Sequence, residues 1–205
     1  MGKKEKSLAC EIKGPGNFFT LRKEDYGVNS RQGTFGEQLE TYLRESSGVS
    51  EDKIFTGNTA ALYNPNLIIV QDNPLVREGE IILTRDLADI VNGTEIKGVR
   101  FSGDKSTRLV FPGFKRGWNT PEQIENNSFL IALTGSVDIP ERVAEFLRKT
   151  DERAYILAPS GISQPSIRVP CFCYEHNGEY RGLVISGVNR IDLGKGSRYS
   201  FATPK

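Results

Sequence analysis

IRVPCFCYEHNGEYRGLVISGV, residues 167–188, carries the strongest local pattern in this chain of 205 residues. Two stretches that alternate between apolar and polar side chains flank Asn177-Gly178, a dipeptide that favours the two-residue turn with positive φ at both central positions. We therefore predict a β-hairpin over 167–188, and because both of its faces are partly apolar we expect it to be central and buried. The two-residue turn pairs the following residues across the hairpin: Phe172 with Leu183, Cys171 with Val184, and Tyr174 with Arg181.

The rest of the chain mixes strand and helix patterns. A second hairpin is predicted over 99–111, and short apolar runs bounded by Gly, Pro and Asn predict strands at 67–70, 81–83, 129–133 and 154–157. Capping boxes predict helices from Thr34 and from Thr120, amphipathic spacing predicts a third from Asp138, and Asp86 is placed to cap a short fourth. The order strand, helix, strand over 129–157 predicts one βαβ crossover.

These patterns predict an α+β fold: a single globular domain, 1–205, with a mixed, β-rich sheet. We expect residues 1–6 and 189–205 to form extended basic termini. The apolar runs are shorter than the roughly 20 residues that a membrane helix needs, so we expect no membrane partner. Three cysteines cannot all pair within the chain, which favours a reducing, cytoplasmic location.

Charge is segregated along the chain although the formal net charge is only +1. Residues 37–90 contain ten Asp and Glu against four Lys and Arg, whereas residues 97–118 contain six Lys and Arg against Asp104 alone. Opposite charges of this kind suit self-association or contact with an acidic neighbour, because complementary potentials speed encounter and fix register.

A basic and aromatic segment is the main candidate binding site. Its cations neutralise phosphates or acidic protein surface, and its aromatic rings stack on bases or fill pockets on a protein neighbour. The candidate binding residues are Arg100, Lys105, Arg108, Phe114, Lys115, Arg116 and Trp118. The alternative is that the aromatic rings of this segment close the domain's own core.

An enzymatic alternative starts from Glu95-Ile96-Lys97, which on a strand places a carboxylate and an ammonium on one face. With an aspartate from a neighbouring strand, either Asp72 or Asp86, this D...ExK pattern resembles the sheet-borne sites of magnesium-dependent nucleases. The carboxylates of such a site hold Mg²⁺, and the lysine orients the attacking water. The same E-x-K pattern also occurs at 11–13 and 51–53, as composition alone would produce.

Other motifs are weaker. Cys171, Cys173 and His176 lie close in sequence and Cys10 would complete a set of four zinc ligands, but alternation along the strand directs His176 away from the two thiols. We therefore predict no metal site there. The segment 98–107 approaches a phosphate-binding loop but places Asp104 before the lysine and continues as a strand.

The sequence therefore favours a non-catalytic intracellular binding or assembly protein with no cofactor, a subunit of a larger complex that contacts protein neighbours or nucleic acid. Sequence-tolerant nucleic-acid binding and a Mg²⁺-dependent nuclease remain as alternatives.

Overall fold

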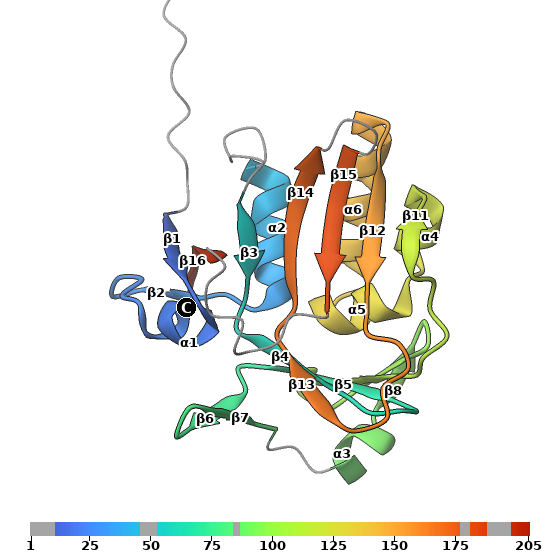
Figure 1. Cartoon of the computed structure of the whole chain (residues 1–205), viewed down its shortest axis with the longest axis horizontal. Coiled ribbons are helices and arrows are strands. Elements are labelled where there is room, and N and C mark those ends of the chain that lie inside the picture. Colours follow the sequence, from blue (N-terminus) through green and yellow to red (C-terminus); the bar gives the residue numbers. More distant parts are fainter. Residues whose placement is uncertain (1–10, 46–52, 84–86, 177–180, 188–197) are drawn as a thin grey trace, which may run out of the picture.

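The predicted hairpin lies at the centre of the largest sheet, as strands β14 (Cys171–His176) and β15 (Arg181–Ser186) (Figure 1). The structure is a computed structural model that describes residues 11–45, 53–83, 87–176, 181–187 and 198–205. The sheet has the strand order β1-β16-β3-β14-β15-β12-β11, with β2 paired to β16. The remaining strands of this sheet are β1 (Ile12–Gly16), β2 (Ser30–Gln32), β3 (Ile54–Thr56), β11 (Gly117–Asn119), β12 (Arg153–Leu157) and β16 (Arg198–Pro204).

The register of the hairpin differs from the prediction by two residues. His176 pairs with Arg181, so four residues separate the paired ends, and the predicted Asn177-Gly178 turn lies outside the described residues. The observed pairs are Phe172 with Ile185, Cys171 with Ser186, and Tyr174 with Leu183. Because side chains alternate with a period of two, a shift of two residues leaves each side chain on its predicted face.

A second sheet lies below the first in Figure 1 and has the order β13-β4-β5-β10-β9-β8. It contains the predicted hairpin at 99–111, in which β9 and β10 pair antiparallel. The strands are β4 (Thr59–Tyr63), β5 (Ile68–Asp72), β8 (Thr94–Ile96), β9 (Val99–Phe101), β10 (Thr107–Val110) and β13 (Ser166–Arg168), and β6 (Leu75–Arg77) with β7 (Glu80–Ile82) forms a separate two-stranded ribbon.

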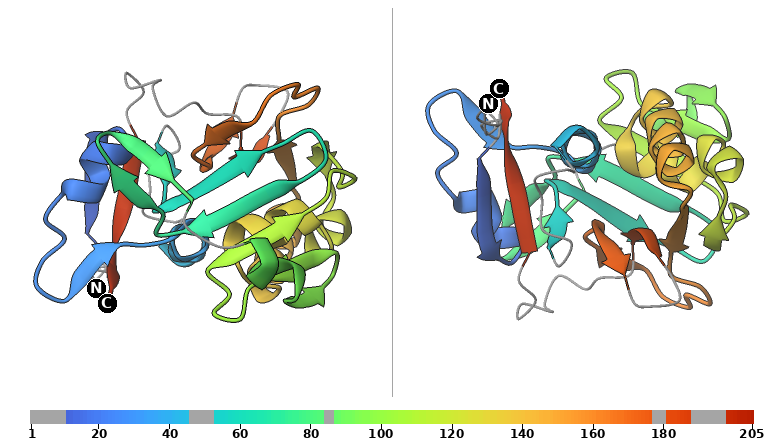
Figure 2. Two further views of the ribbon diagram at one scale, coloured as in Figure 1. Left: turned by 90° about the horizontal axis from the view of Figure 1, so that it is seen from below. Right: turned by 90° about the horizontal axis from the view of Figure 1, so that it is seen from above.

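Helices cover one face of the first sheet. In Figures 1 and 2, α2 (Phe35–Glu45), α5 (Ser128–Thr134) and α6 (Asp138–Thr150) lie on one side of β14, β15 and β12. The core between them includes Phe35, Leu133 and Leu147 from the helices and Phe172 and Ile185 from the sheet, all fully buried. The other helices are α1 (Phe18–Lys23), α3 (Leu87–Val91) and α4 (Pro121–Glu125).

The capping predictions are confirmed for α2 and α4. The Thr34 N–H donates to Glu37 Oε2 at 2.7 Å, and the Glu37 N–H donates to Thr34 Oγ1 at 3.3 Å. The Thr120 N–H donates to Gln123 Oε1 at 3.0 Å. The predicted cap at Asp86 lies outside the described residues.

The predicted strand at 129–133 is wrong, because these residues form helix α5. The Asn127 side chain accepts from the Leu130 N–H at 3.2 Å at its start, and Gly135 ends it with φ of 69°. Every residue of Phe129–Thr134 is buried, and an all-buried helix shows the same unbroken apolar run as a buried strand. The chain therefore has no βαβ crossover over 129–157, although β12 does pair parallel to β15.

The C-terminal segment is also more ordered than the predicted extended arm. Its described part, β16, pairs antiparallel with β1 and β2 and parallel with β3, and β1 and β16 lie side by side in Figure 2. Phe201 is fully buried and stacks on Phe55 with ring centroids 4.6 Å apart. This apolar anchor overrides the basic character of the segment, while residues 1–6 and 188–197 lie outside the described part of the chain.

Parallel and antiparallel pairs occur in the first sheet, so the α+β class with a mixed, β-rich core is confirmed. Within the described ranges, no helix combines the length and the apolar character needed to span a bilayer.

Candidate binding surface

The residues of the nuclease hypothesis lie apart. Asp72, at the end of β5, forms a buried ion pair with Arg108 of β10. Glu95 lies on β8, and β10 and β9 separate β5 from β8, so the strands themselves are about 14 Å apart. Asp86 lies outside the described residues.

Glu95 and Lys97 do not share a strand face. Glu95 pairs with Arg100 across the β8–β9 hairpin, with Oε2 and Nε 3.2 Å apart. Lys97 occupies the turn with φ of 48°, and its Nζ lies 3.4 Å from the Glu141 carboxylate on α6. The described residues contain no group of three or more His, Cys, Asp or Glu side chains placed to hold a metal ion. The nuclease hypothesis requires Glu95, Lys97 and an aspartate to meet at one site, and among the described residues they do not.

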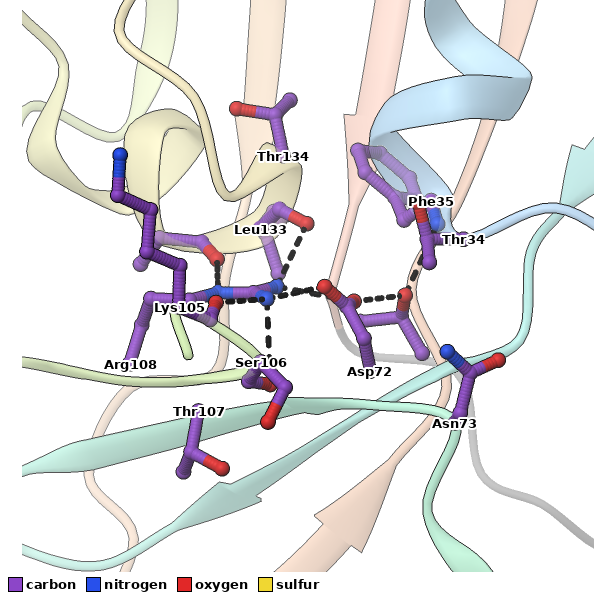
Figure 3. Close-up of polar contacts among 12 residues, drawn as sticks. Thr34, Phe35, Asp72, Asn73, Lys105, Ser106, Thr107, Arg108, Leu133 and Thr134 are labelled. Carbon is purple, nitrogen blue, oxygen red and sulfur yellow. Dashed lines mark hydrogen bonds and ion pairs between the residues drawn. The ribbon is translucent and has the colours of Figure 1, made fainter. Parts of the chain in front are cut away.

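Asp72 and Arg108 instead form a structural junction (Figure 3). The Arg108 guanidinium contacts both Asp72 oxygens, and its Nε donates to the Ala132 carbonyl at 2.8 Å, near the end of α5. Thr59 Oγ1 donates to Asp72 Oδ1 at 2.6 Å and accepts from the Phe35 N–H at 2.9 Å. One buried ion pair therefore joins the second sheet to the end of α5 and the start of α2.

Two of the predicted binding residues are buried and cannot contact a partner. The side chain of Arg108 is 0% exposed. Phe114 is 9% exposed and stacks on Phe129 with ring centroids 4.6 Å apart. For Phe114 the alternative is confirmed, because its ring closes the domain's own core.

The other cations of the basic segment contact different parts of the molecule. Arg100 pairs with Glu95, Lys115 Nζ donates to Gln123 Oε1 at 2.6 Å, and Arg116 donates to the Pro159 carbonyl at 3.3 Å and lies over the Phe114 ring. Lys105 is exposed in the β9–β10 turn. The basic segment therefore does not form one continuous, unpaired cationic surface.

Trp118 belongs to a row of side chains that crosses four adjacent strands. It pairs with Tyr155, Tyr155 pairs with Val184, and Val184 pairs with Cys173. These residues are half-buried, and Phe172, Leu183 and Ile156 on the opposite face of the same strands are buried against the helices. We call Trp118, Tyr155, Val184 and Cys173 the outer row.

The two aromatic rings of the outer row contact each other and lie beside a glycine. Trp118 and Tyr155 meet edge to face with ring centroids 5.2 Å apart. Beside them Gly182 provides room, because a Cβ there would lie 2.1 Å from the Arg153 carbonyl oxygen and 3.4 Å from the indole. The glycine thus lets β12 approach β15 closely under the tryptophan.

The outer row has polar residues on one side and apolar residues on the other. Arg153 lies two residues before Tyr155 on β12, and Glu175 lies two residues after Cys173 on β14. Both are exposed. In the opposite direction Leu157 is 38% exposed, whereas Cys171 is buried. The outer face is therefore an apolar and aromatic strip with charges of both signs at one margin.

The Cys173 thiol of the strip is not suited to thiolate chemistry. Burial, with a further contribution from Glu175, raises the pKa of the Cys173 thiol to about 12. The thiol is therefore neutral at physiological pH, whereas zinc binding and nucleophilic attack need the thiolate. The side chain of His176 lies outside the described part.

Trp118 could be selected from the sequence by its residue type, whereas Tyr155, Val184 and Leu157 could not. The alternation within Arg153–Leu157 indicated which residues share a face, but both faces carry apolar side chains. Only the position of the helices shows that Ala154 and Ile156 face the core.

No family model matches the sequence, and no curated protein matches it. A solved structure described as "Accommodation of massive sequence variation in Nanoarchaeota by the C-type lectin fold" is similar in architecture, with a TM-score of 0.58. The similarity covers 96% of this chain and 99% of that chain, at 12% sequence identity. The chain therefore has a C-type lectin-like fold.

Proposed function

We propose that this chain is a non-catalytic binding protein that recognises a protein partner through the outer face of its largest sheet. The observation that carries the proposal is the outer row, in which Trp118 and Tyr155 stand half-exposed on a sheet face whose opposite side is covered by helices. Tryptophan, tyrosine and arginine are the side chains that most often supply binding energy at protein interfaces.

A protein suits this surface better than a nucleic acid or a small molecule. A sheet face offers a broad contact area, whereas small ligands bind in concave pockets. Nucleic-acid binding draws on cations free to neutralise phosphates. The outer row itself contains no cation, and Arg100 and Arg108 are already paired with carboxylates. Charges of both signs at the margin, on Arg153 and Glu175, suit the polar rim of a protein interface.

The similar structure supports the same proposal. Its description states that the C-type lectin fold accommodates massive sequence variation in Nanoarchaeota. A scaffold of this kind suits recognition, because outer-face residues can change while the inner face keeps the core intact. In this chain the core residues Phe172 and Leu183 alternate with the outer-row residues Cys173 and Val184 along the same strands.

The test begins by recovering a partner with a photo-cross-linker placed at position 155. The same cross-linker at position 149 is the control, because Lys149 of α6 is exposed on the helical side of the sheet. The affinity of the purified partner is then measured for Trp118→Ala, Tyr155→Ala and the control Lys149→Ala. We expect each outer-row change to weaken binding at least about tenfold and the control to leave it unchanged. A partner that binds all three variants equally, or that cross-links only from position 149, contradicts the proposal.

A further inference from the structure

The second sheet has an apolar face that points away from α5, and we call this face the underside. Four residues that pair successively across β10, β5, β4 and β13 form a row on it: Leu109, Ile69, Leu62 and Ile167. The alternate residues of these strands belong to the core that includes α5. Ile90 of α3 packs against Leu109 and Ile69, whereas Leu62 and Ile167 are only half-buried. In the view from below in Figure 2, β4 and β5 face the viewer, with the β6–β7 ribbon on one side and α3 on the other.

The β6–β7 ribbon carries a more exposed part of the same surface. Its inner residues Val76 and Ile81 pack in a small apolar cluster. On its other face Leu75 lies directly opposite Ile82, and these side chains are 49% and 37% exposed. Leu83, which follows β7, packs against both this cluster and the cluster under α3, so the ribbon and the row are continuous. A contiguous apolar surface that is left partly exposed marks an interaction site.

The tip of the ribbon places opposite charges side by side on its exposed face. Arg77 pairs with Glu80 across a turn formed by Glu78 and Gly79, which have φ of 53° and 83°. The Arg77 guanidinium lies 3.7 Å from the Glu78 carboxylate, and both side chains are mostly exposed. Within the described ranges the Glu80 carboxylate has no ion-pair partner. Because exposed ion pairs contribute little to stability, Arg77 and Glu80 are available for contacts with another molecule.

We propose that two copies of this chain form a homodimer through the underside, with their β6–β7 ribbons face to face. The exposed face of the ribbon is self-complementary under a two-fold axis that runs parallel to its strands. This rotation lays β6 of one copy over β7 of the other, so Leu75 meets Ile82 of the second copy. Arg77 likewise meets Glu80 of the second copy, and the symmetry repeats both contacts. An axis across the strands would instead place the apolar pair over the charged pair.

The dimer needs more contact area than the ribbons supply. A stable interface buries about 800 Å² on each partner, so the contact extends over the half-buried part of the row and over α3. Val91 of α3 is 52% exposed and adds to the apolar surface. The homodimer is independent of the proposed function, because the outer row lies on the first sheet and the underside belongs to the second.

The first experiment measures the mass of the full chain by sedimentation equilibrium over a range of concentrations. We expect a monomer–dimer equilibrium with Kd of about 100 μM or tighter. Ile82→Glu places a carboxylate in the apolar contact and should weaken the dimer at least about tenfold. The control is Val28→Glu on the α1–β2 connection, where the side chain is 89% exposed, and it should leave the dimer unchanged.

A charge exchange tests the two-fold arrangement itself. Arg77→Glu and Glu80→Arg each place like charges opposite one another between the copies, so each variant alone should dimerise at least about tenfold more weakly. An equimolar mixture of the two variants restores opposite charges between the copies, and we expect the mixed dimer to form with nearly the original affinity. Each chain keeps its altered ribbon in the mixture, so an effect inside one chain cannot produce this recovery.

Three results would overturn the proposal. The first is a chain that stays monomeric up to about 1 mM, including one whose underside binds a different protein. The second is a dimer that Ile82→Glu leaves unchanged, and the third is a mixture of the two charge variants that dimerises no better than either variant alone.

Discussion

Arg108 shows how one buried side chain holds several elements together. Its guanidinium is fully buried and contacts Asp72 and the carbonyls of Ala132 and Leu133, so its removal leaves the Asp72 carboxylate, 14% exposed, without its cation. We expect Arg108→Met to lower the free energy of unfolding by about 3–5 kcal/mol in urea titration. Arg100→Met, which breaks the exposed pair with Glu95, should cost less than about 1 kcal/mol. Similar losses for the two variants would show that Arg108 is not a structural junction.

Glu37 gives α2 a stability that depends on pH. Burial alone would raise the pKa of this carboxyl, but hydrogen bonds from Arg31 and from the Thr34 N–H together outweigh it and hold the pKa below its ordinary 4.5. A carboxyl with a lowered folded-state pKa stabilises the protein above its unfolded-state pKa and loses this effect as the pH falls through the folded-state value.

We therefore expect Glu37→Gln to destabilise the protein by about 1 kcal/mol at pH 7, the typical size of a cap contribution. The difference from the unaltered protein should shrink as the pH falls below 4.5, the ordinary value of this carboxyl. The measurement is thermal or urea unfolding at several pH values, with the exposed Glu145→Gln on α6 as control. A difference that stays constant down to pH 2 would contradict the assigned role.

Helix α5 depends on its C-terminal glycine. Gly135 has φ of 69°, and a Cβ there would lie 3.1 Å from Nη1 of Arg108, a guanidinium that its hydrogen bonds hold in place. Gly161 has φ of 64° with nothing within 4 Å of the added Cβ, so it is a matched control for the backbone cost alone. Both alanine variants should lose about 1 kcal/mol, and Gly135→Ala should lose roughly another 1 kcal/mol or more by urea titration. Equal losses would mean that Arg108 moves aside freely.

Helix α5 is also the element whose type could not be predicted from the sequence. The hairpins at 99–111 and 167–188, the amphipathic helices and the α+β class followed from spacing and turn residues, because each has a local periodicity. Phe129–Leu133 has no periodicity, since all of its side chains are buried, and only its contacts with α2 and α6 distinguish a helix from a strand. The C-terminal strand was missed because the burial of Phe201 depends on Phe55, far away in the sequence.

The candidate site was also predictable only in part, because contacts between residues far apart in the sequence bring it together. Trp118 could be selected by residue type, but its neighbours Tyr155 and Val184 come from strands far apart in sequence whose register no local pattern fixes. Charge counts were misleading, because they ignore pairing: Arg108 meets Asp72 and Lys97 meets Glu141 only in the folded chain.

At the scale of the whole molecule, the side chains that form the core are different from those of the proposed binding surface. Residues of the inner face pack under the helices, while the half-buried Trp118 and Tyr155 meet edge to face on the outer face. We expect Tyr155→Ala to lower the free energy of unfolding by less than about 2 kcal/mol, whereas Phe172→Ala costs about 3–5 kcal/mol. Urea titration of the two variants checks this. Comparable losses would place Tyr155 in the core and weaken its role as a contact residue.

Trp118 is the only tryptophan of the chain, so its fluorescence reports on the proposed surface without labelling. The most direct measurement is the emission spectrum and acrylamide quenching of Trp118 during titration with the purified partner that was identified by cross-linking. A form of this partner without tryptophan is used, so that all of the emission comes from Trp118. We expect a saturable blue shift of the Trp118 emission and reduced quenching, both following the binding curve. Saturated binding that leaves emission and quenching of Trp118 unchanged would contradict it.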